Sequence, residues 1–212
     1  MKMVFGKLRE YRVVPVVAVD SVDDGLKLCE ALLAGGLPVA EITFRTAAAE
    51  AVIRAASQQF PDMILGAGTV LTSDQAQRAA DAGAKFAVAP GFNPVVVAAA
   101  RRAGLPFAPG VCTPSDIEAA VAAGCTMLKF FPAEASGGVP MLKALIGPYG
   151  HLGLQFCPTG GVTTENLRAY LALPAVAFVG GTWIAKKEFI QAGQWGEISA
   201  LAAAARAAAN GR

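Results

Sequence analysis

At residues 126–132 the chain reads Thr126-Met127-Leu128-Lys129-Phe130-Phe131-Pro132, an apolar run with a single charged side chain. Its length, and the glycine and proline that bound it, predict a buried β-strand. Because side chains alternate along a strand, Met127, Lys129 and Phe131 share one face, and that face offers no acid. The strand therefore predicts a buried lysine that has no partner from its own segment.

Burial of an unpaired ammonium is costly and favours the neutral amine. A neutral lysine amine in an apolar pocket is a nucleophile for carbonyl carbon. The alternative is structural: Lys129 extends to the strand end, or it pairs with a distant carboxylate. This stretch alone leaves both interpretations open.

Apolar runs alternate with helix start signals along the rest of the sequence. Strands are expected at Val13–Val19, Val39–Phe44, Met63–Ala67, Lys85–Ala89, Pro106–Pro109, Thr126–Phe131, Leu154–Cys157 and Ala175–Val179. Helix N-caps are expected at Ser21, Thr46, Thr72, Asn93, Thr113 and Thr163, and each helix ends at a glycine or a proline. Consecutive strand–helix units of this length predict an α/β protein, a single-domain (β/α)8 TIM barrel over residues 1–212 with a short N-terminal helix. A doubly wound open sheet is the alternative.

Composition excludes several classes of function. The chain has 212 residues, 54% of them hydrophobic, and a formal net charge of +2 without a basic run, which argues against nucleic-acid and membrane-surface partners. Four cysteines without a CxxC pair and one histidine give no zinc-ligand spacing, so neither a metal nor a cofactor is expected. The first residues do not resemble a signal peptide, and we expect a cytoplasmic protein.

The second predicted strand carries polar side chains on one face. Glu41, Thr43 and Arg45 alternate with apolar residues, so they point into the predicted barrel. Glu41 is a candidate general base, and Arg45 is a candidate clamp for a substrate carboxylate. The alternative is a structural ion pair of Glu41 with Lys129 or Arg45, although well-packed hydrophobic residues often stabilise a core equally well.

Two glycine pairs follow the last two predicted strands, in Pro158-Thr159-Gly160-Gly161 and in Val179-Gly180-Gly181-Thr182. In barrels of this class these two loops commonly bind phosphate through backbone N–H groups. Neither loop contains a lysine or an arginine, so the predicted phosphate site depends on backbone dipoles. A pair of tight turns is the structural alternative.

Five motifs in this order resemble the class I 2-keto-3-deoxy-6-phosphogluconate (KDPG) aldolases, a family that also includes 4-hydroxy-2-oxoglutarate aldolases. They are Glu41-Ile-Thr-Phe-Arg45-Thr46, Gly66-Ala-Gly-Thr69, Lys129-Phe-Phe-Pro-Ala-Glu134, Pro158-Thr-Gly-Gly161 and Gly180-Gly181. The resemblance covers nearly the whole chain. It implies a lyase that reversibly cleaves KDPG to pyruvate and glyceraldehyde 3-phosphate, a step of the Entner–Doudoroff pathway, and that also accepts 4-hydroxy-2-oxoglutarate. It further implies a homotrimer.

The resemblance also implies roles for individual residues. Lys129 corresponds to the Schiff-base lysine and Glu41 to the general acid and base. Arg45 and Thr69 correspond to the site for the pyruvate carboxylate, and Pro90 and Phe131 to the pocket walls. The distal hydroxyls and the phosphate would be held by Thr159, Gly160, Gly161 and Gly181, with Thr182 where a serine is common in the gluconate enzymes.

Several sequence features distinguish this function from its alternatives. The end of the first strand, Val17-Ala-Val-Asp20, lacks the arginine of some galactonate-preferring relatives, which favours the gluconate branch. Metal-dependent aldolases and phosphosugar isomerases both require catalytic histidines, and His151 precedes the seventh strand, on the face opposite the predicted site. A non-catalytic phosphate-binding barrel is the main alternative, and it does not require Lys129 and Glu41 to point inward together.

Overall fold

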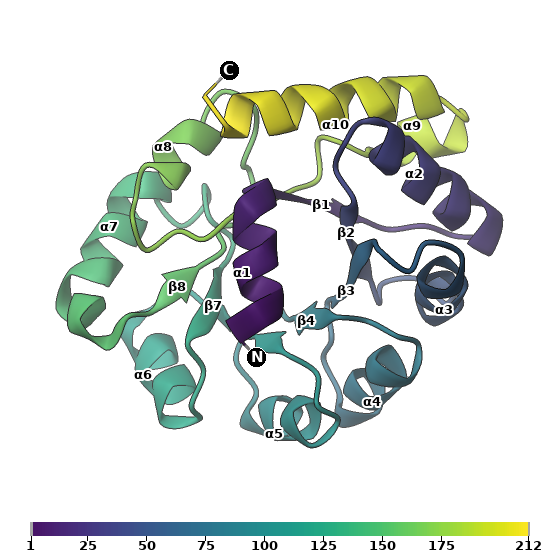
Figure 1. Cartoon of the computed structure of the whole chain (residues 1–212). Helices are drawn as coiled ribbons and strands as arrows, with labels where there is room; N and C mark the ends of the chain where they lie inside the picture. Colours follow the sequence, from purple (N-terminus) through teal and green to yellow (C-terminus); the bar gives the residue numbers. More distant parts are fainter. Residues whose placement is uncertain (1, 212) are drawn as a thin grey trace.

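The computed structural model describes residues 2–211, in which short parallel β-strands are surrounded by α-helices (Figure 1). The strands are β1 (Val13–Val17), β2 (Val39–Thr43), β3 (Ile64–Gly68), β4 (Phe86–Val88), β5 (Phe107–Ala108), β6 (Gly110–Val111), β7 (Met127–Phe130), β8 (Gln155–Phe156) and β9 (Val179–Gly181). The helices are α1 (Lys2–Tyr11), α2 (Val22–Ala34), α3 (Ala49–Gln59), α4 (Ser73–Asp81), α5 (Pro94–Arg102), α6 (Pro114–Ala122), α7 (Gly138–Tyr149), η1 (Gly150–Leu152, a 3-10 turn), α8 (Leu167–Leu171), α9 (Lys187–Gln191) and α10 (Trp195–Ala209).

The predicted closed (β/α)8 TIM barrel is wrong. The strands form two sheets, one of six strands in the order β5-β4-β3-β2-β1-β9 and one of three in the order β6-β7-β8. Pro109 separates β5, which pairs with β4, from β6, which pairs with β7. Because proline has no N–H and is disfavoured inside a sheet, the hydrogen-bond ladder is interrupted at this point. On the other side, within residues 2–211, no strand pairing joins β8 to β9, and isolated bridges occur between Phe156 and Val176 and between Thr159 and Gly180.

Most predicted strands overlap the observed ones, and the last strand is displaced. The apolar run Ala175–Val179 predicts a strand, whereas β9 begins at Val179 and continues through both glycines. Pairing explains the shift, since Val179, Gly180 and Gly181 lie opposite Val13, Val14 and Pro15 of β1. The apolar segment before β9 is buried without a regular ladder, so hydrophobicity alone places the strand too early.

Four of the predicted N-caps are confirmed. Thr113 forms a full capping box with Asp116, and Ser21, Thr72 and Asn93 each accept a hydrogen bond from a backbone N–H in the first turn. Thr46 and Thr163 do not cap their helices. The hydroxyl of Thr46 donates instead to the carbonyl oxygen of Val19, which fastens the loop after β2 to the loop after β1.

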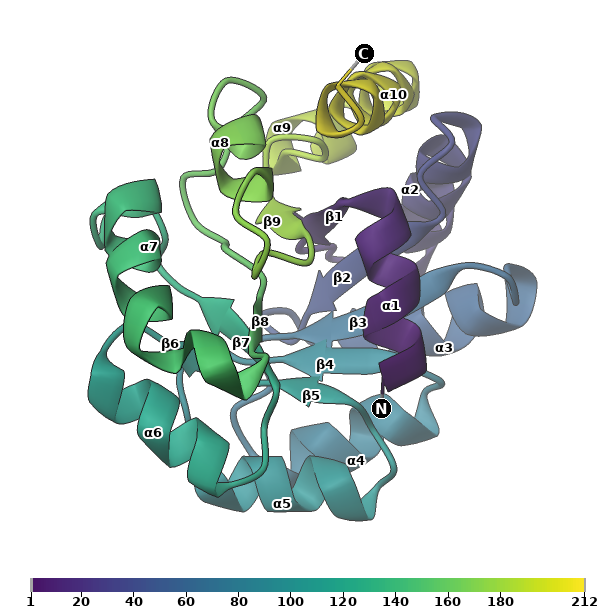
Figure 2. The same ribbon diagram turned by 60° about the vertical axis from the view of Figure 1, so that its left-hand side comes forward.

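The amino-terminal helix α1 lies against the strands, inside the ring formed by the other helices (Figures 1 and 2). Its Leu8 is fully buried, and the ring of Phe5 meets the ring of Phe86 edge to face, with centroids 6.2 Å apart. Phe86 begins β4, so α1 covers the amino-terminal ends of the strands. The carboxyl-terminal ends, where the candidate residues lie, are therefore on the other side. Between residues 2 and 211, no helix combines the length and apolarity that a membrane crossing requires.

Candidate active site

Glu41 and Lys129 meet in the interior although 88 residues separate them. Glu41 belongs to β2 in the six-stranded sheet and Lys129 to β7 in the three-stranded sheet. Lys129 Nζ donates to Glu41 Oε1 at 3.1 Å, and the two residues are 5% and 4% exposed. The partner that Lys129 lacks on its own strand is thus supplied by the other sheet. This contact places an amine and a carboxylate, two groups that could act as a nucleophile and a base, within hydrogen-bond distance of each other.

The space for the Glu41 carboxylate depends on Gly68. A Cβ atom at position 68 would lie 2.3 Å from Glu41 Oε1 and 2.8 Å from its Cγ, far inside van der Waals contact. Gly68 pairs with Thr43 at the carboxyl-terminal end of β3, so the carboxylate occupies the volume that a side chain there would take. The sequence identifies Gly66–Thr69 as one of the family motifs and Thr69 as a candidate site residue, but it does not identify Gly68.

Thr43 ends β2, and Arg45 follows it in the turn after the strand, with its side chain hydrogen-bonded to that of Thr43. Arg45 Nε donates to Thr43 Oγ1 at 3.1 Å, and the Thr43 hydroxyl donates to the carbonyl oxygen of Val17 at 3.1 Å. Thr43 is buried, whereas Arg45 is exposed at the rim. Within residues 2–211 the other guanidinium nitrogens of Arg45 have no acceptor, so they remain available to an anion. Thr43 thus fixes one nitrogen of the Arg45 guanidinium group, a contact that the sequence does not predict.

Phe131, Thr69 and Pro90 are the other residues expected at the pyruvate end, and only Phe131 has a measured contact with Lys129. The Phe131 ring centroid lies 5.7 Å from Lys129 Nζ, which makes this ring a wall of the site. Thr69 directly follows β3 and has a positive φ of 55°, and Pro90 lies in the loop after β4. Among the described residues, Thr69 and Pro90 form no hydrogen bond with Lys129 or Glu41. The structure thus places Thr69 and Pro90 at the same strand ends without a hydrogen bond to Lys129 or Glu41.

The two glycine loops are held together by Thr159. This residue is buried and forms an isolated bridge with Gly180 of β9, where a Cβ atom would lie 2.4 Å from Thr159 Oγ1. Gly160 and Gly161 both have positive φ, 98° and 78°, and within residues 2–211 their amides donate to no acceptor. Gly181 ends β9, and Thr182 is exposed just beyond it. Two unpaired amides and an exposed hydroxyl thus flank the bridge, a suitable arrangement for an anion.

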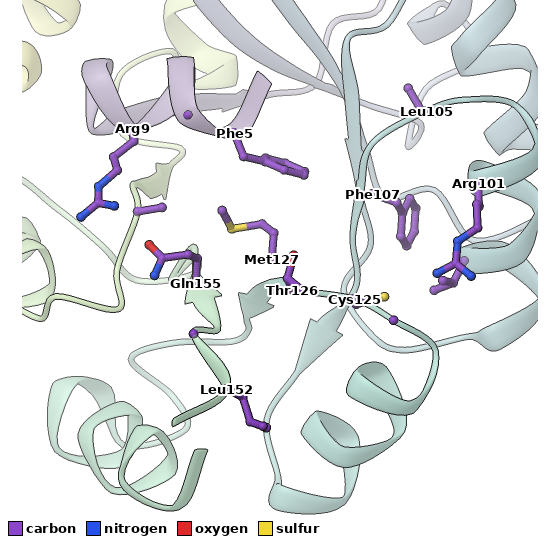
Figure 3. A pocket seen from close by; sticks show the side chains of 15 residues that line it. Phe5, Arg9, Arg101, Leu105, Phe107, Cys125, Thr126, Met127, Leu152 and Gln155 are labelled. Atoms are coloured by element: carbon purple, nitrogen blue, oxygen red, sulfur yellow. The ribbon is translucent and has the colours of Figure 1, made fainter. Parts of the chain in front are cut away.

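A cavity of about 490 Å³ lies at the other end of the strands (Figure 3). Phe5 of α1, Phe107 and Met127 line it, together with Arg9 and Gln155, and none of the candidate site residues does. Phe107 and Met127 are the first residues of β5 and β7, which places this cavity at the amino-terminal strand ends. It is separate from the Lys129–Glu41 contact.

A family model for KDPG and KHG aldolases, where KHG is the 4-hydroxy-2-oxoglutarate substrate, matches residues 4–201. The chain belongs to the KDPG and KHG aldolase family. It is 48% identical over 200 residues to the 2-dehydro-3-deoxy-phosphogluconate aldolase of Haemophilus influenzae, with 94% of this chain and 93% of that protein covered. The family expected from the motif order, and with it the aldolase class of enzyme, is therefore confirmed.

Two solved structures of aldolases resemble this one over nearly their whole length. The KDPG aldolase of Legionella pneumophila, with pyruvate captured at low pH as a covalent carbinolamine, has a TM-score of 0.91, 40% identity, and coverage of 96% of this chain and 98% of that chain. The 2-keto-3-deoxy-6-phosphogluconate aldolase of Zymomonas mobilis, solved with 3-phosphoglycerate, has a TM-score of 0.87, 35% identity, and coverage of 98% and 96%. The overall fold of this chain is thus that of the two solved aldolases.

Proposed function

We propose that this aldolase reversibly cleaves 2-keto-3-deoxy-6-phosphogluconate to pyruvate and glyceraldehyde 3-phosphate, and also 4-hydroxy-2-oxoglutarate to pyruvate and glyoxylate. The observation that carries the proposal is the buried contact between Lys129 Nζ and Glu41 Oε1. The Legionella relative forms a covalent carbinolamine with pyruvate, and a carbinolamine requires an amine nucleophile of the kind that Lys129 offers.

The first half of the reaction forms the imine. Lys129 passes a proton to Glu41 across their hydrogen bond, and the neutral amine attacks the C2 ketone to give a carbinolamine. Glu41 returns the proton to the departing hydroxyl, which leaves as water and generates a protonated imine. The cation at nitrogen then accepts the electron pair of the C3–C4 bond. The Phe131 ring, 5.7 Å from the same nitrogen, favours this cation through its π face.

The second half breaks the carbon–carbon bond. Glu41, again ionised, removes the proton of the C4 hydroxyl, and glyceraldehyde 3-phosphate leaves as the C3–C4 electron pair forms the enamine. Protonation of C3 by Glu41 and hydrolysis of the imine release pyruvate and restore the lysine. Arg45 and Thr69 bind the substrate carboxylate throughout, with the Arg45 guanidinium oriented by Thr43.

The phosphate end of the substrate is assigned to Thr159, Gly160, Gly161, Gly181 and Thr182. Free amides at Gly160 and Gly161 support this assignment, as does the 3-phosphoglycerate with which the Zymomonas relative was solved. The proposal also includes one aldolase domain over residues 1–212, a homotrimer and a cytoplasmic location. The four cysteines, Cys29, Cys112, Cys125 and Cys157, are free, which is compatible with a reducing compartment.

Borohydride reduction in the presence of pyruvate tests the mechanism directly. Mass mapping should show one reduced pyruvate on Lys129, and an assay coupled to pyruvate release should show cleavage of the phosphorylated substrate. Adducts at Lys85 or Lys143 instead of Lys129 would show that the nucleophile is wrong. An absence of pyruvate release would favour the non-catalytic phosphate-binding protein.

Chelation provides an independent test, because no step of the proposed mechanism uses a metal ion. Treatment of the enzyme with excess EDTA should leave the rate of pyruvate release within about twofold of the untreated value. A large loss that a divalent ion restores would contradict the Schiff-base mechanism and support a metal-dependent aldolase.

A further inference from the structure

The loop after β7 is bonded directly to the first of the two glycine loops. Ala133 N donates to the carbonyl oxygen of Thr159 at 2.8 Å, and Glu134 N donates to the carbonyl oxygen of Gly160 at 3.0 Å. These two bonds hold the Glu134 side chain beside the amides that we assign to the substrate phosphate. A Cβ atom at Gly161 would lie 2.6 Å from Glu134 Cβ and 2.7 Å from its Cγ. A carboxylate therefore lies next to a site proposed for a dianion.

The orientation of this carboxylate is controlled from α8. The Tyr170 hydroxyl donates to Glu134 Oε1, and the Tyr170 side chain is fully buried. Burial and the hydrogen bond to Glu134 raise the pKa of the Tyr170 hydroxyl, so it remains a donor throughout the neutral range. Among residues 2–211, Glu134 has no cationic partner and no other side-chain donor. Gly138 leaves room for the contact, because a Cβ atom there would lie 3.2 Å from Glu134 Oε1.

A free carboxylate beside Gly160 and Gly161 would compete with the substrate. Unpaired backbone amides bind carboxylates as they bind phosphates, and like charges at short range repel. The hydrogen bond from Tyr170 holds the carboxylate on the α8 side and leaves both amides unoccupied, which matches the absence of acceptors for them within residues 2–211.

We propose that Tyr170 and Glu134 are positioning residues that determine affinity for the phosphorylated substrate by keeping the Glu134 carboxylate out of the phosphate site. This inference rests on the proposed function, and it adds Tyr170 and Glu134 to the residues that determine phosphate binding. The backbone of Glu134 supports the glycine loop, and its side chain is the charge that Tyr170 restrains.

The Tyr170→Phe variant removes only the hydroxyl. It should raise KM for 2-keto-3-deoxy-6-phosphogluconate about tenfold, while kcat and borohydride trapping of pyruvate on Lys129 stay at the wild-type values. KM for 2-keto-3-deoxygluconate, which lacks the phosphate, should not change. The double variant Tyr170→Phe, Glu134→Gln should return KM for the phosphorylated substrate to within about twofold of wild type, because the competing charge is gone.

A merely structural role predicts the opposite result for the double variant, which would then be at least as impaired as Tyr170→Phe. That outcome, or an unchanged KM in Tyr170→Phe, would overturn the inference. If Tyr170→Phe does not fold, the single variant Glu134→Gln tests the inference. This variant should bind glyceraldehyde 3-phosphate as tightly as the wild-type enzyme, and weaker binding would overturn the inference. Failure of the wild-type enzyme to trap pyruvate would instead reject the proposed function.

Discussion

The two ends of the candidate site use different chemistry. At the pyruvate end, charged side chains converge from two sheets, with Lys129 and Glu41 both about 5% exposed. At the phosphate end, the proposed binding groups are mainly backbone amides of glycines, and the segments 158–161 and 179–182 that carry them contain no lysine or arginine. In the proposed mechanism, covalent bonds change at the pyruvate end, and the phosphate end binds a charged group that does not react.

This difference is consistent with the task of each end. Proton transfer requires side chains that gain and lose protons within hydrogen-bond distance, and burial keeps water from competing. A phosphate that stays ionised throughout requires fixed dipoles, which glycine amides supply. Substitutions of Lys129 and Glu41 at the pyruvate end should therefore affect rate constants, and substitutions at the phosphate end should affect the affinity for phosphorylated substrates.

The largest effect is expected for Lys129→Met, which removes the nucleophile and fills a similar volume. Pyruvate trapping by borohydride and cleavage of the phosphorylated substrate should both fall below detection. Lys143→Met is the matched control, because Lys143 is exposed on α7. Residual trapping in Lys129→Met would place the imine at another lysine and would remove the chemical distinction between the two ends.

The next largest effect is expected for Glu41→Gln, which removes the base and keeps the shape of the side chain. Imine formation needs the amine, whereas enamine formation also needs a base at C3. The variant should therefore still be trapped by borohydride, while exchange of the pyruvate methyl protons in D2O, followed by proton NMR, should fall by about 10²–10⁴-fold. Exchange at the wild-type rate would make Glu41 a structural carboxylate only.

A smaller and more selective effect is expected for Gly161→Val. The positive φ of 78° disfavours valine, and the new side chain would displace Glu134. The value of kcat/KM for the phosphorylated substrate should fall about 100-fold, and that for 4-hydroxy-2-oxoglutarate less than tenfold. Gly147→Val is the control, because a Cβ atom at Gly147 meets nothing within 4 Å. Equal losses on both substrates would argue against a phosphate site in this loop.

The smallest effect is expected for Arg45→Lys, which keeps the charge and loses the planar fork that Thr43 orients. The pyruvate concentration that gives half-maximal trapping should rise about tenfold, with little change in the rate of methyl exchange at saturation. If the exchange rate falls as much as it does in Glu41→Gln, Arg45 takes part in the chemistry as well as in binding.

Local signals in the sequence are reliable where neighbouring residues determine the structure. Thr113 caps its helix because Asp116 lies three positions later, and the spacing of two between Thr43 and Arg45 allows their side chains to hydrogen-bond at the end of β2. The closed barrel is wrong because closure depends on ladders between distant segments. The strand expected at Pro106–Pro109 ends at Pro109, and the next two residues, Gly110 and Val111, form β6 in the other sheet. Val179 begins the last strand where the apolar run ends.

The chemistry of the site can be predicted in part, because some of its residues are unusual for their local sequence. A lysine in an apolar strand and a glutamate on an inward face are visible as unusual residues, and motif order identifies the family. Their contact is not predictable, because 88 residues separate them and a structural pair with Arg45 is equally compatible with the pattern. Glu134 and Tyr170 show no signal of their own: one ends a motif and the other lies in a helix 36 residues away.

Gly68 shows how this site can be lost without any change in a reacting group. A single methyl group at position 68 would meet Glu41 Oε1 at 2.3 Å and force the carboxylate away from Lys129. A homologue with alanine there would retain the lysine, the glutamate and the arginine, and it would still resemble the family in most of its motifs. Catalytic activity in relatives therefore requires a glycine at position 68 as well as the reacting groups around it. We expect the residue at position 68 to distinguish active aldolases from inactive homologues.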